Sequence, residues 1–218
     1  MNPPALTSQS LARLSPLART FYARDPRDVA RDLLGKLLVR RQGRLLLTGR
    51  IVETEAYLGV SDPGAHAYVG RTPRNAVLFG PPGHAYVYFI YGNHYCTNIS
   101  CQPAGYAGCV LLRALEPVSG IESMARLRSI TLGANPSPTQ LRQLTSGPGR
   151  LSQAMSITRE RDNAKDLCSP ESDLYITDDG SRDSPVSATP RVNVTRAPLD
   201  EWRYVITGNQ FVSGKKMS

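Results

Sequence analysis

The residues best suited to chemistry are two carboxylates in a run of strand-forming residues, Arg-Ile-Val-Glu-Thr-Glu-Ala-Tyr at positions 50–57. A strand would hold Glu53 and Glu55 about 6.5–7 Å apart, near the separation at which an acid and a base flank a glycosidic bond. Because unpaired buried carboxylates are costly, their face should line a cleft or be ordinary surface with ion pairs. Alternation predicts that one face of this strand holds Ile51, Glu53, Glu55 and Tyr57. The other face, which we expect to be the apolar one, holds Val52, Thr54, Ala56 and Leu58.

A second candidate is the arginine within Val110-Leu-Leu-Arg-Ala-Leu115, a run typical of a buried strand. A buried charge needs a partner, and Glu53 or Glu55 is the acid available to Arg113. The alternative is a structural salt bridge without a chemical role.

A glycine-rich segment, Ser146-Gly-Pro-Gly-Arg150, precedes a predicted helix. Free backbone N–H groups at such a helix start, with Arg150 close by, would suit a phosphate. The signal is weak by itself, since helix-hairpin-helix DNA-binding proteins contain a similar segment.

Residues 86–98 hold four of the ten tyrosines around the pair Gly92-Asn93. Gly and Asn readily supply the positive φ of a tight turn, so the segment predicts a β-hairpin. Alternation places Tyr86 and Tyr88 on one face and Tyr91 at the tip, where it could act as a wedge in a duplex. The alternative is a tyrosine-rich strand packed in a core.

The formal net charge is +8, and its excess is concentrated in two regions. Residues 1–50 hold ten Lys/Arg against three Asp/Glu, and residues 121–160 hold five against two. Flanking arginines that hold a polyanion, while another segment does chemistry, would produce this pattern and favour a nucleic-acid partner. The alternative is a solvated arginine-rich surface, since only four of the 26 basic residues are lysine.

The order of elements that must position these residues indicates an α+β fold. We expect a single domain with a mainly antiparallel curved sheet, peripheral helices and a protruding β-hairpin. Residues 1–20 are expected to be a disordered arm, and 21–218 the domain. Asp25-Pro26 predicts a helix start and Gly35 its end. Further helices are expected at 121–129 and 149–157, a loop at 132–139, and strands at 36–41, 44–58, either side of Gly92, 109–115, 173–177, 191–195 and 203–207.

The sequence has no run near the roughly 18 apolar residues of a membrane span, and its first twenty residues lack a secretory signal pattern. We expect a cytoplasmic protein without membrane contact, at the nucleoid in a bacterium or in the nucleus of a eukaryote. The four cysteines lack paired metal-site spacing, and the three histidines are scattered. We therefore expect reduced thiols, no metal and no cofactor.

Seven segments together carry a resemblance to a known family: Arg50–Tyr57, His66, Thr72–Asn75, Tyr86–Gly92, Asn98–Ser100, Leu111–Pro117 and Ser146–Leu151. They resemble the alkyladenine (3-methyladenine) DNA glycosylase family, and the likeness runs from about Phe21 to the C-terminus. Order and spacing are kept, including the eleven residues from Glu55 to His66. The family has a single-domain α+β fold that flips a damaged purine out of DNA and hydrolyses its N-glycosidic bond.

The resemblance implies a role for each candidate residue. Glu55 would activate the attacking water, held with the help of Arg113 and the backbone carbonyl of Val192. Asn98 would exclude undamaged guanine, and Tyr91 would fill the gap left in the duplex. The walls of the base pocket would be Tyr57, His66, Tyr88 and Leu111, and the phosphate contacts would be Gly147, Gly149, Arg150 and Arg74.

The same resemblance implies the reaction. A monomer would act on damaged double-stranded DNA, remove 3-methyladenine, 7-methylguanine, hypoxanthine or ethenoadenine, and leave an abasic site. Since Lys36, Lys165, Lys215 and Lys216 all lie outside the motifs, we expect no lyase step through a Schiff base. Asn93 and His94 depart from the family, whose best-known members carry a bulky apolar residue and an aromatic there.

Two other functions would use part of the pattern. The basic regions and aromatic hairpin would suit a non-catalytic nucleic-acid-binding module, although Glu53 and Glu55 would repel phosphate. A carbohydrate glycosidase would use the carboxylate pair but leaves the basic charge unexplained. Release of free base from alkylated DNA separates these three functions.

Overall fold

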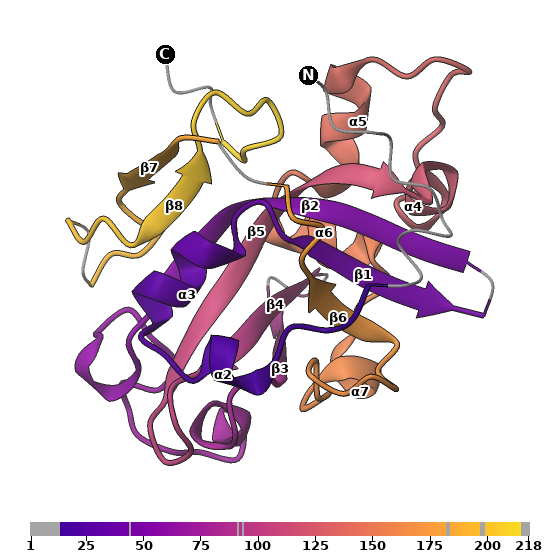
Figure 1. Cartoon of the computed structure of the whole chain (residues 1–218). Helices are drawn as coiled ribbons and strands as arrows, with labels where there is room; N and C mark the ends of the chain where they lie inside the picture. Colours follow the sequence, from indigo (N-terminus) through magenta and orange to yellow (C-terminus); the bar gives the residue numbers. More distant parts are fainter. Residues whose placement is uncertain are drawn as a thin grey trace.

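The computed structural model describes residues 14–43, 45–90, 92, 94–181, 184–196 and 199–214. In these residues eight strands form one sheet, with the order β3-β4-β5-β2-β1-β6 and with β8 paired to β2 and β7 to β8. Every pairing is antiparallel, and the sheet curves with helices around it (Figure 1), which confirms the predicted α+β class.

The strands are β1 Leu37–Gln42, β2 Leu45–Tyr57, β3 Ala85–Ile90, β4 His94–Cys101, β5 Gly108–Ser119, β6 Leu174–Thr177, β7 Val186–Thr189 and β8 Arg203–Ile206. The helices are α2 Arg19–Tyr22, α3 Pro26–Leu33, α4 Ile121–Leu127, α5 Pro138–Thr145, α6 Pro148–Ala154 and α7 Arg159–Asp162, with 3-10 turns η1 Gly59–Ser61 and η2 Ala76–Phe79.

Helix α3 begins and ends where the sequence predicts. The carboxylate of Asp25 caps it by accepting a 2.8 Å hydrogen bond from the amide of Arg27, and Pro26 occupies the first helical position. Beyond Leu33, Gly35 adopts a φ of 84°, which ends the helix at little steric cost. The buried face of α3 packs against β2 and β5.

The side of β2 that faces the main core changes midway along the strand. Ile51 packs in the main core together with Ala56, although strict alternation puts them on opposite faces. The register against β5 shifts on both sides of Glu53, and this irregularity resets the alternation. The predicted faces are therefore wrong for Ile51 and Val52. Beyond the shift they hold, since the Thr54 hydroxyl donates to the backbone of α3 at 2.9 Å.

Strands β3 and β4 form the predicted hairpin, paired from Ala85 opposite Ile99 to Ile90 opposite His94. Alternation holds along β3, because Val87 packs in the main core while Tyr86 and Tyr88 pack in a separate cluster. The expected tip residues Tyr91 and Asn93 lie outside the described residues, so the wedge stays a prediction.

The late part of the chain differs from the prediction. Residues 191–195 form a turn and irregular structure, while β7, at Val186–Thr189, pairs with β8 on the side away from β2. Tertiary contacts of Arg191 and Val192, described below, override the strand propensity of this segment. Helix α5 occupies part of the predicted loop, and Ser137 and Gln140 form a capping box at its start.

The packed chain begins earlier than the expected boundary at residue 21. The amide of Leu17 donates to the carbonyl of Ile176 at 2.8 Å, and the carbonyl of Ser15 accepts a 2.6 Å hydrogen bond from the Thr177 hydroxyl. Residues 1–13 of the expected arm lie outside the described residues. In the described ranges, no helix has the length and apolar character needed to cross a bilayer.

Candidate active site

One row of paired residues crosses four strands and carries the candidate site. Glu55 on β2 lies opposite Leu111 on β5, which lies opposite Asn98 on β4, which in turn lies opposite Tyr86 on β3. Residues paired directly across neighbouring strands share a face of the sheet. The sheet therefore brings residues from four separate motifs to one buried row.

This face borders a cavity of about 400 Å³, a size typical of small-molecule sites. A smaller cavity of about 60 Å³ shares Tyr57 and Tyr88 with it and extends to His66 and Asn98. The structure thus brings together around the two cavities the following predicted residues: Glu55, Tyr57, His66, Tyr88, Asn98, Leu111, Arg113, Gly147, Gly149, Arg150 and Val192. Arg74 lines a neighbouring cavity of about 530 Å³, which shares His66 and Tyr86 with the small one.

The carboxylate of Glu55 is buried and held from both oxygens. Its Oε2 accepts a 2.8 Å hydrogen bond from the hydroxyl of Tyr57, and its Oε1 accepts one of 2.7 Å from the backbone amide of Val192. A guanidinium nitrogen of Arg113 lies 3.2 Å from the same Oε1. The resemblance implies a role for the carbonyl of Val192, whereas the contact present here is made by its N–H. These donors fix the direction of a carboxylate that lines the cavity.

Glu53 has a different environment, although it is also fully buried. Its Oε1 lies 2.7 Å from Nε of both Arg113 and Arg203, and its Oε2 accepts a hydrogen bond from the amide of Ser213. Burial alone would raise the pKa of Glu53, but Arg113 and Arg203 hold it below its ordinary value. Arg113 therefore has both predicted acids as partners, Glu53 with the shorter contact, and Glu53 supports the site without lining the cavity.

The aromatic walls form one cluster beside the carboxylate. The rings of His66 and Tyr88 meet edge to face with centroids 4.5 Å apart, and Nδ1 of His66 lies 3.0 Å from the hydroxyl of Tyr86. Burial, reinforced by the cationic Arg74, lowers the pKa of His66 below its ordinary value. Burial raises the pKa of Tyr57 and of Tyr88 well above the usual range of a phenol. Near neutral pH this wall is therefore uncharged, as stacking on a cationic base requires.

The Asn98 side chain is fixed within the small cavity. Its Nδ2 donates a 3.1 Å hydrogen bond to the carbonyl of Tyr86, and only 2% of the residue is exposed. This rigid amide at the cavity wall suits the predicted role in excluding a base with an additional group.

The glycine-rich segment borders the large cavity, but its chemistry differs from the prediction. The amide of Gly147 donates to the carbonyl of Arg113 at 3.0 Å, so this N–H is not free for a phosphate. A Cβ on Gly149 would lie 2.9 Å from the His94 ring, so glycine allows the segment to pack against the hairpin. Arg150 is exposed at the cavity edge and keeps its predicted place.

The basic residues of positions 1–50 are largely used within the fold. Each of the following has an aspartate within ion-pair distance: Arg19, Arg24, Arg27, Lys36, Arg40 and Arg50. The contribution of this region to DNA binding stays a prediction. Arg74 and Arg150, by contrast, line the cavities beside Glu55 and His66.

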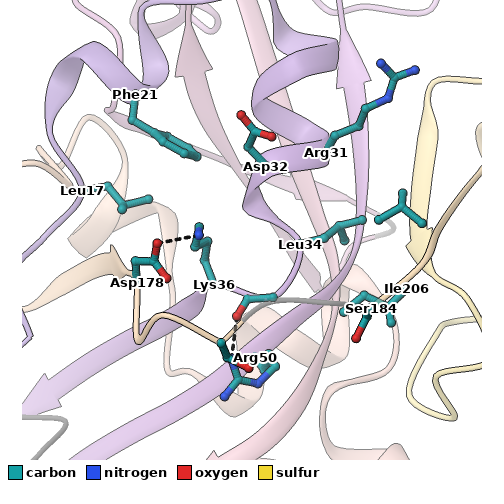
Figure 2. A pocket seen from close by; sticks show the side chains of 13 residues that line it. Leu17, Phe21, Arg31, Asp32, Leu34, Lys36, Arg50, Asp178, Ser184 and Ile206 are labelled. Atoms are coloured by element: carbon teal, nitrogen blue, oxygen red, sulfur yellow. Dashed lines mark hydrogen bonds and ion pairs between the residues drawn. The ribbon is translucent and has the colours of Figure 1, made fainter.

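A further cavity of about 430 Å³ lies beside α3 and the start of β1 (Figure 2). Two of its cations are ion-paired, since Lys36 lies 2.7 Å from Asp178 and Arg50 lies 2.8 Å from Asp179. Its lining mixes these pairs with apolar side chains such as Phe21. We assign it no part in the chemistry of Glu55.

The sequence analysis did not identify three buried residues that support the site. Asp62 stood in a turn-forming Asp-Pro-Gly, Arg191 in a predicted strand and Ser213 near the end of the chain. The one available signal was Asp62, an acidic turn residue close to Glu55 in sequence, because a buried arginine such as Arg191 needs an acid as its partner. The described residues contain no group of three or more side chains placed to hold a metal ion.

Known proteins resemble this chain over most of its length. The family described as Methylpurine-DNA glycosylase (MPG) matches residues 20–210. A protein of Koribacter versatilis is 57% identical over 207 residues, covering 95% of this chain and 97% of its own length. Proteins of Burkholderia lata and Clostridium acetobutylicum are 46% and 45% identical, and the matches cover 91% and 90% of this chain and 91% and 97% of theirs. All three carry the name "Putative 3-methyladenine DNA glycosylase".

Proposed function

Because the chain belongs to the methylpurine-DNA glycosylase family, we propose that it releases 3-methyladenine from damaged duplex DNA by hydrolysing the N-glycosidic bond, with Glu55 acting on the water. The observation that carries the mechanism is the Glu55 carboxylate, buried on the cavity and held by Tyr57, Val192 and Arg113. The protein acts as a monomer on DNA in the cytoplasm and leaves an abasic site. 7-Methylguanine, hypoxanthine and ethenoadenine complete the proposed substrate range.

The chemistry demanded of the protein is modest for a cationic lesion. A purine alkylated at N3 or N7 carries positive charge and is a good leaving group, so the enzyme mainly has to place a water at C1′ and accept its proton. As the bond breaks, positive charge develops on the sugar, and a fixed carboxylate next to it is stabilising. Glu55 supplies both effects from one position. Glu53 keeps Arg113 in place and balances its charge.

Base recognition follows from the uncharged aromatic wall. Tyr57, Tyr88 and neutral His66 offer π faces that attract a cationic, electron-poor ring. Stacking of about 1–3 kcal/mol per ring offsets the few kcal/mol that flipping costs. Asn98, held by the carbonyl of Tyr86, excludes undamaged guanine by a clash with its exocyclic amine.

The decisive test compares the parent with Glu55→Gln on duplex DNA containing 3-methyladenine. Glutamine keeps the size of the side chain but cannot accept the proton, so lesion binding should persist while base release falls by about 10²–10⁴-fold. Glu53→Gln is the control, since it leaves Arg113 and Arg203 without their shared acid. It should lower the melting temperature more than Glu55→Gln does.

Three outcomes contradict parts of the proposal. A parent protein that binds alkylated DNA without releasing base is a non-catalytic binding module. If Glu55→Gln excises base at nearly the parental rate while folded Glu53→Gln does not, Glu53 is the residue that acts on the water and Glu55 has the supporting role. A covalent complex trapped by borohydride would show a lyase, which the proposal excludes.

A further inference from the structure

Arg191 joins two loops behind the cavity. Its side chain is fully buried and forms two hydrogen bonds with Asp62, from Nη1 to Oδ2 at 2.6 Å and from Nη2 to Oδ1 at 2.9 Å. Nη1 also donates to the carbonyl of Ala56 at 3.1 Å. Ala56 is the residue between Glu55 and Tyr57, so the guanidinium is attached to the backbone of the site itself.

The same guanidinium contacts two aromatic rings. Its Cζ is 4.7 Å from the ring centroid of Tyr57 and 4.8 Å from that of Trp202. A planar guanidinium can stack on rings and form a two-pronged bond to a carboxylate at once, which an ammonium cannot. Arg191 thereby supports Tyr57, whose hydroxyl holds Oε2 of Glu55.

The next residue in the chain holds the other carboxylate oxygen. The amide of Val192 donates to Oε1 of Glu55 at 2.7 Å, and its position depends on where the Arg191 side chain is anchored. Besides Arg113, two donors hold Glu55, the Tyr57 hydroxyl and the Val192 amide. Both are thus connected to the guanidinium of Arg191.

Asp62 is itself fixed, so the anchor is rigid. Its Oδ2 accepts a 3.1 Å hydrogen bond from the amide of Leu58, and its Oδ1 accepts one of 2.9 Å from the amide of Gly64. A buried carboxylate with two backbone donors and a two-pronged arginine keeps a single orientation. Gly64 lines the small cavity, so this turn is also part of its wall.

We propose that Asp62 and Arg191 are a pair of positioning residues that hold Tyr57 and the Val192 amide against Glu55, and that excision depends on this pair beyond its contribution to folding. The proposal rests on the proposed function. Neither side chain lines the large cavity, so both act through Tyr57 and Val192. Loss of the pair should leave the carboxylate in place but allow its direction and the stacking wall to vary.

The chain offers a matched control in a second buried pair, Arg40 with Asp162. Both of these side chains are also fully buried, Nη2 lies 2.7 Å from Oδ1, and Asp162 likewise accepts a backbone hydrogen bond, from Thr158. Asp162 lies on α7, outside both cavities. Asp62→Asn and Asp162→Asn therefore remove the same charge from a buried arginine pair, although Asp162 also has Lys165 at 2.9 Å and Arg161 at 3.3 Å. Only the first substitution should affect the site.

The experiment measures base release in a single turnover at saturating enzyme, together with melting temperature. Both variants should lose thermal stability, but Asp62→Asn should also slow release by about 10- to 100-fold, the effect of a slightly misplaced reacting group. Asp162→Asn should release base at the parental rate below its melting temperature. Arg191→Gln should resemble Asp62→Asn, and the double variant should be no slower than the worse single variant, because the two residues act as one unit.

A second readout separates positioning from folding. Ethenoadenine in duplex DNA is fluorescent, and stacking on Tyr57 changes its emission when it is flipped. Asp62→Asn should reduce this change while binding undamaged DNA as the parent does. Equal excision rates for the folded Asp62→Asn and Asp162→Asn proteins overturn the proposal, whereas a parent that releases no base overturns the proposed function instead.

Discussion

The backbone amide of Ser213 donates a 2.6 Å hydrogen bond to the buried carboxylate of Glu53. The Ser213 hydroxyl also lies 2.9 Å from Oε1 of Glu53 and accepts a 3.2 Å hydrogen bond from Arg113. The last described turn of the chain therefore completes the charge cluster that holds Arg113 beside Glu55. Sequence separation of 160 residues makes this a contact that only the folded chain can form.

A chain ending at Val212 should unfold more easily than one ending at Gly214. The shorter chain leaves Glu53 without two of its donors, and losing hydrogen bonds to a buried charge should lower the free energy of unfolding by about 2–4 kcal/mol. Urea denaturation of the two proteins measures the difference. Equal stability would mean that water or a neighbouring group replaces Ser213.

Stability should depend on His66 below neutral pH. Burial and Arg74 lower its pKa in the folded chain, so the unfolded chain takes up a proton first as the pH falls. The contribution of neutral His66 is complete above the unfolded value of about 6.5 and is lost as the pH falls towards the lower folded value. Urea denaturation at pH 7.5 and 5.5 should show a larger loss for the parent than for His66→Gln. The same pH dependence in both proteins would contradict the shifted pKa.

DNA binding should weaken steeply with salt, through the arginines at the cavities rather than those of positions 1–50. Arg150→Ala and Arg74→Ala should each reduce the slope of log affinity against log salt by about one, because each removes one phosphate contact. Arg24→Ala is the control, since Arg24 pairs with Asp32 at 2.8 Å. If Arg24→Ala changes the slope of log affinity against log salt and Arg150→Ala does not, the DNA contacts the surface of positions 1–50 and not the cavities.

Tyr91→Ala should weaken binding to lesion-containing duplex by about 1–3 kcal/mol, through lost stacking in the position vacated by the flipped base. The expectation comes from the hairpin sequence. Because single-stranded DNA has no vacated position, the same substitution should matter less there. Comparing affinities for the two forms of the same lesion oligonucleotide measures this. An equal loss on both would make Tyr91 a packing residue and not a wedge.

The sequence by itself determined the features that depend on neighbours in the chain. The α3 boundaries follow from Asp25, Pro26 and Gly35, and the β3–β4 hairpin follows from the pair Gly92-Asn93 between two strand-forming runs. It also indicated that Arg113 needs Glu53 or Glu55, since a charge within an apolar run must be neutralised. These conclusions need only local conformational preference and charge balance.

The tertiary structure decided which of the two carboxylates lines the cavity. Two glutamates two residues apart are equivalent in sequence, but the register shift around Glu53 and the arrival of Arg203 and Ser213 bury it among donors. Glu55 is left on the cavity with Tyr57 and Val192. The Asp62–Arg191 pair also spans 129 residues and breaks a predicted strand. Such contacts depend on how distant segments pack against each other, which no local pattern of residues encodes.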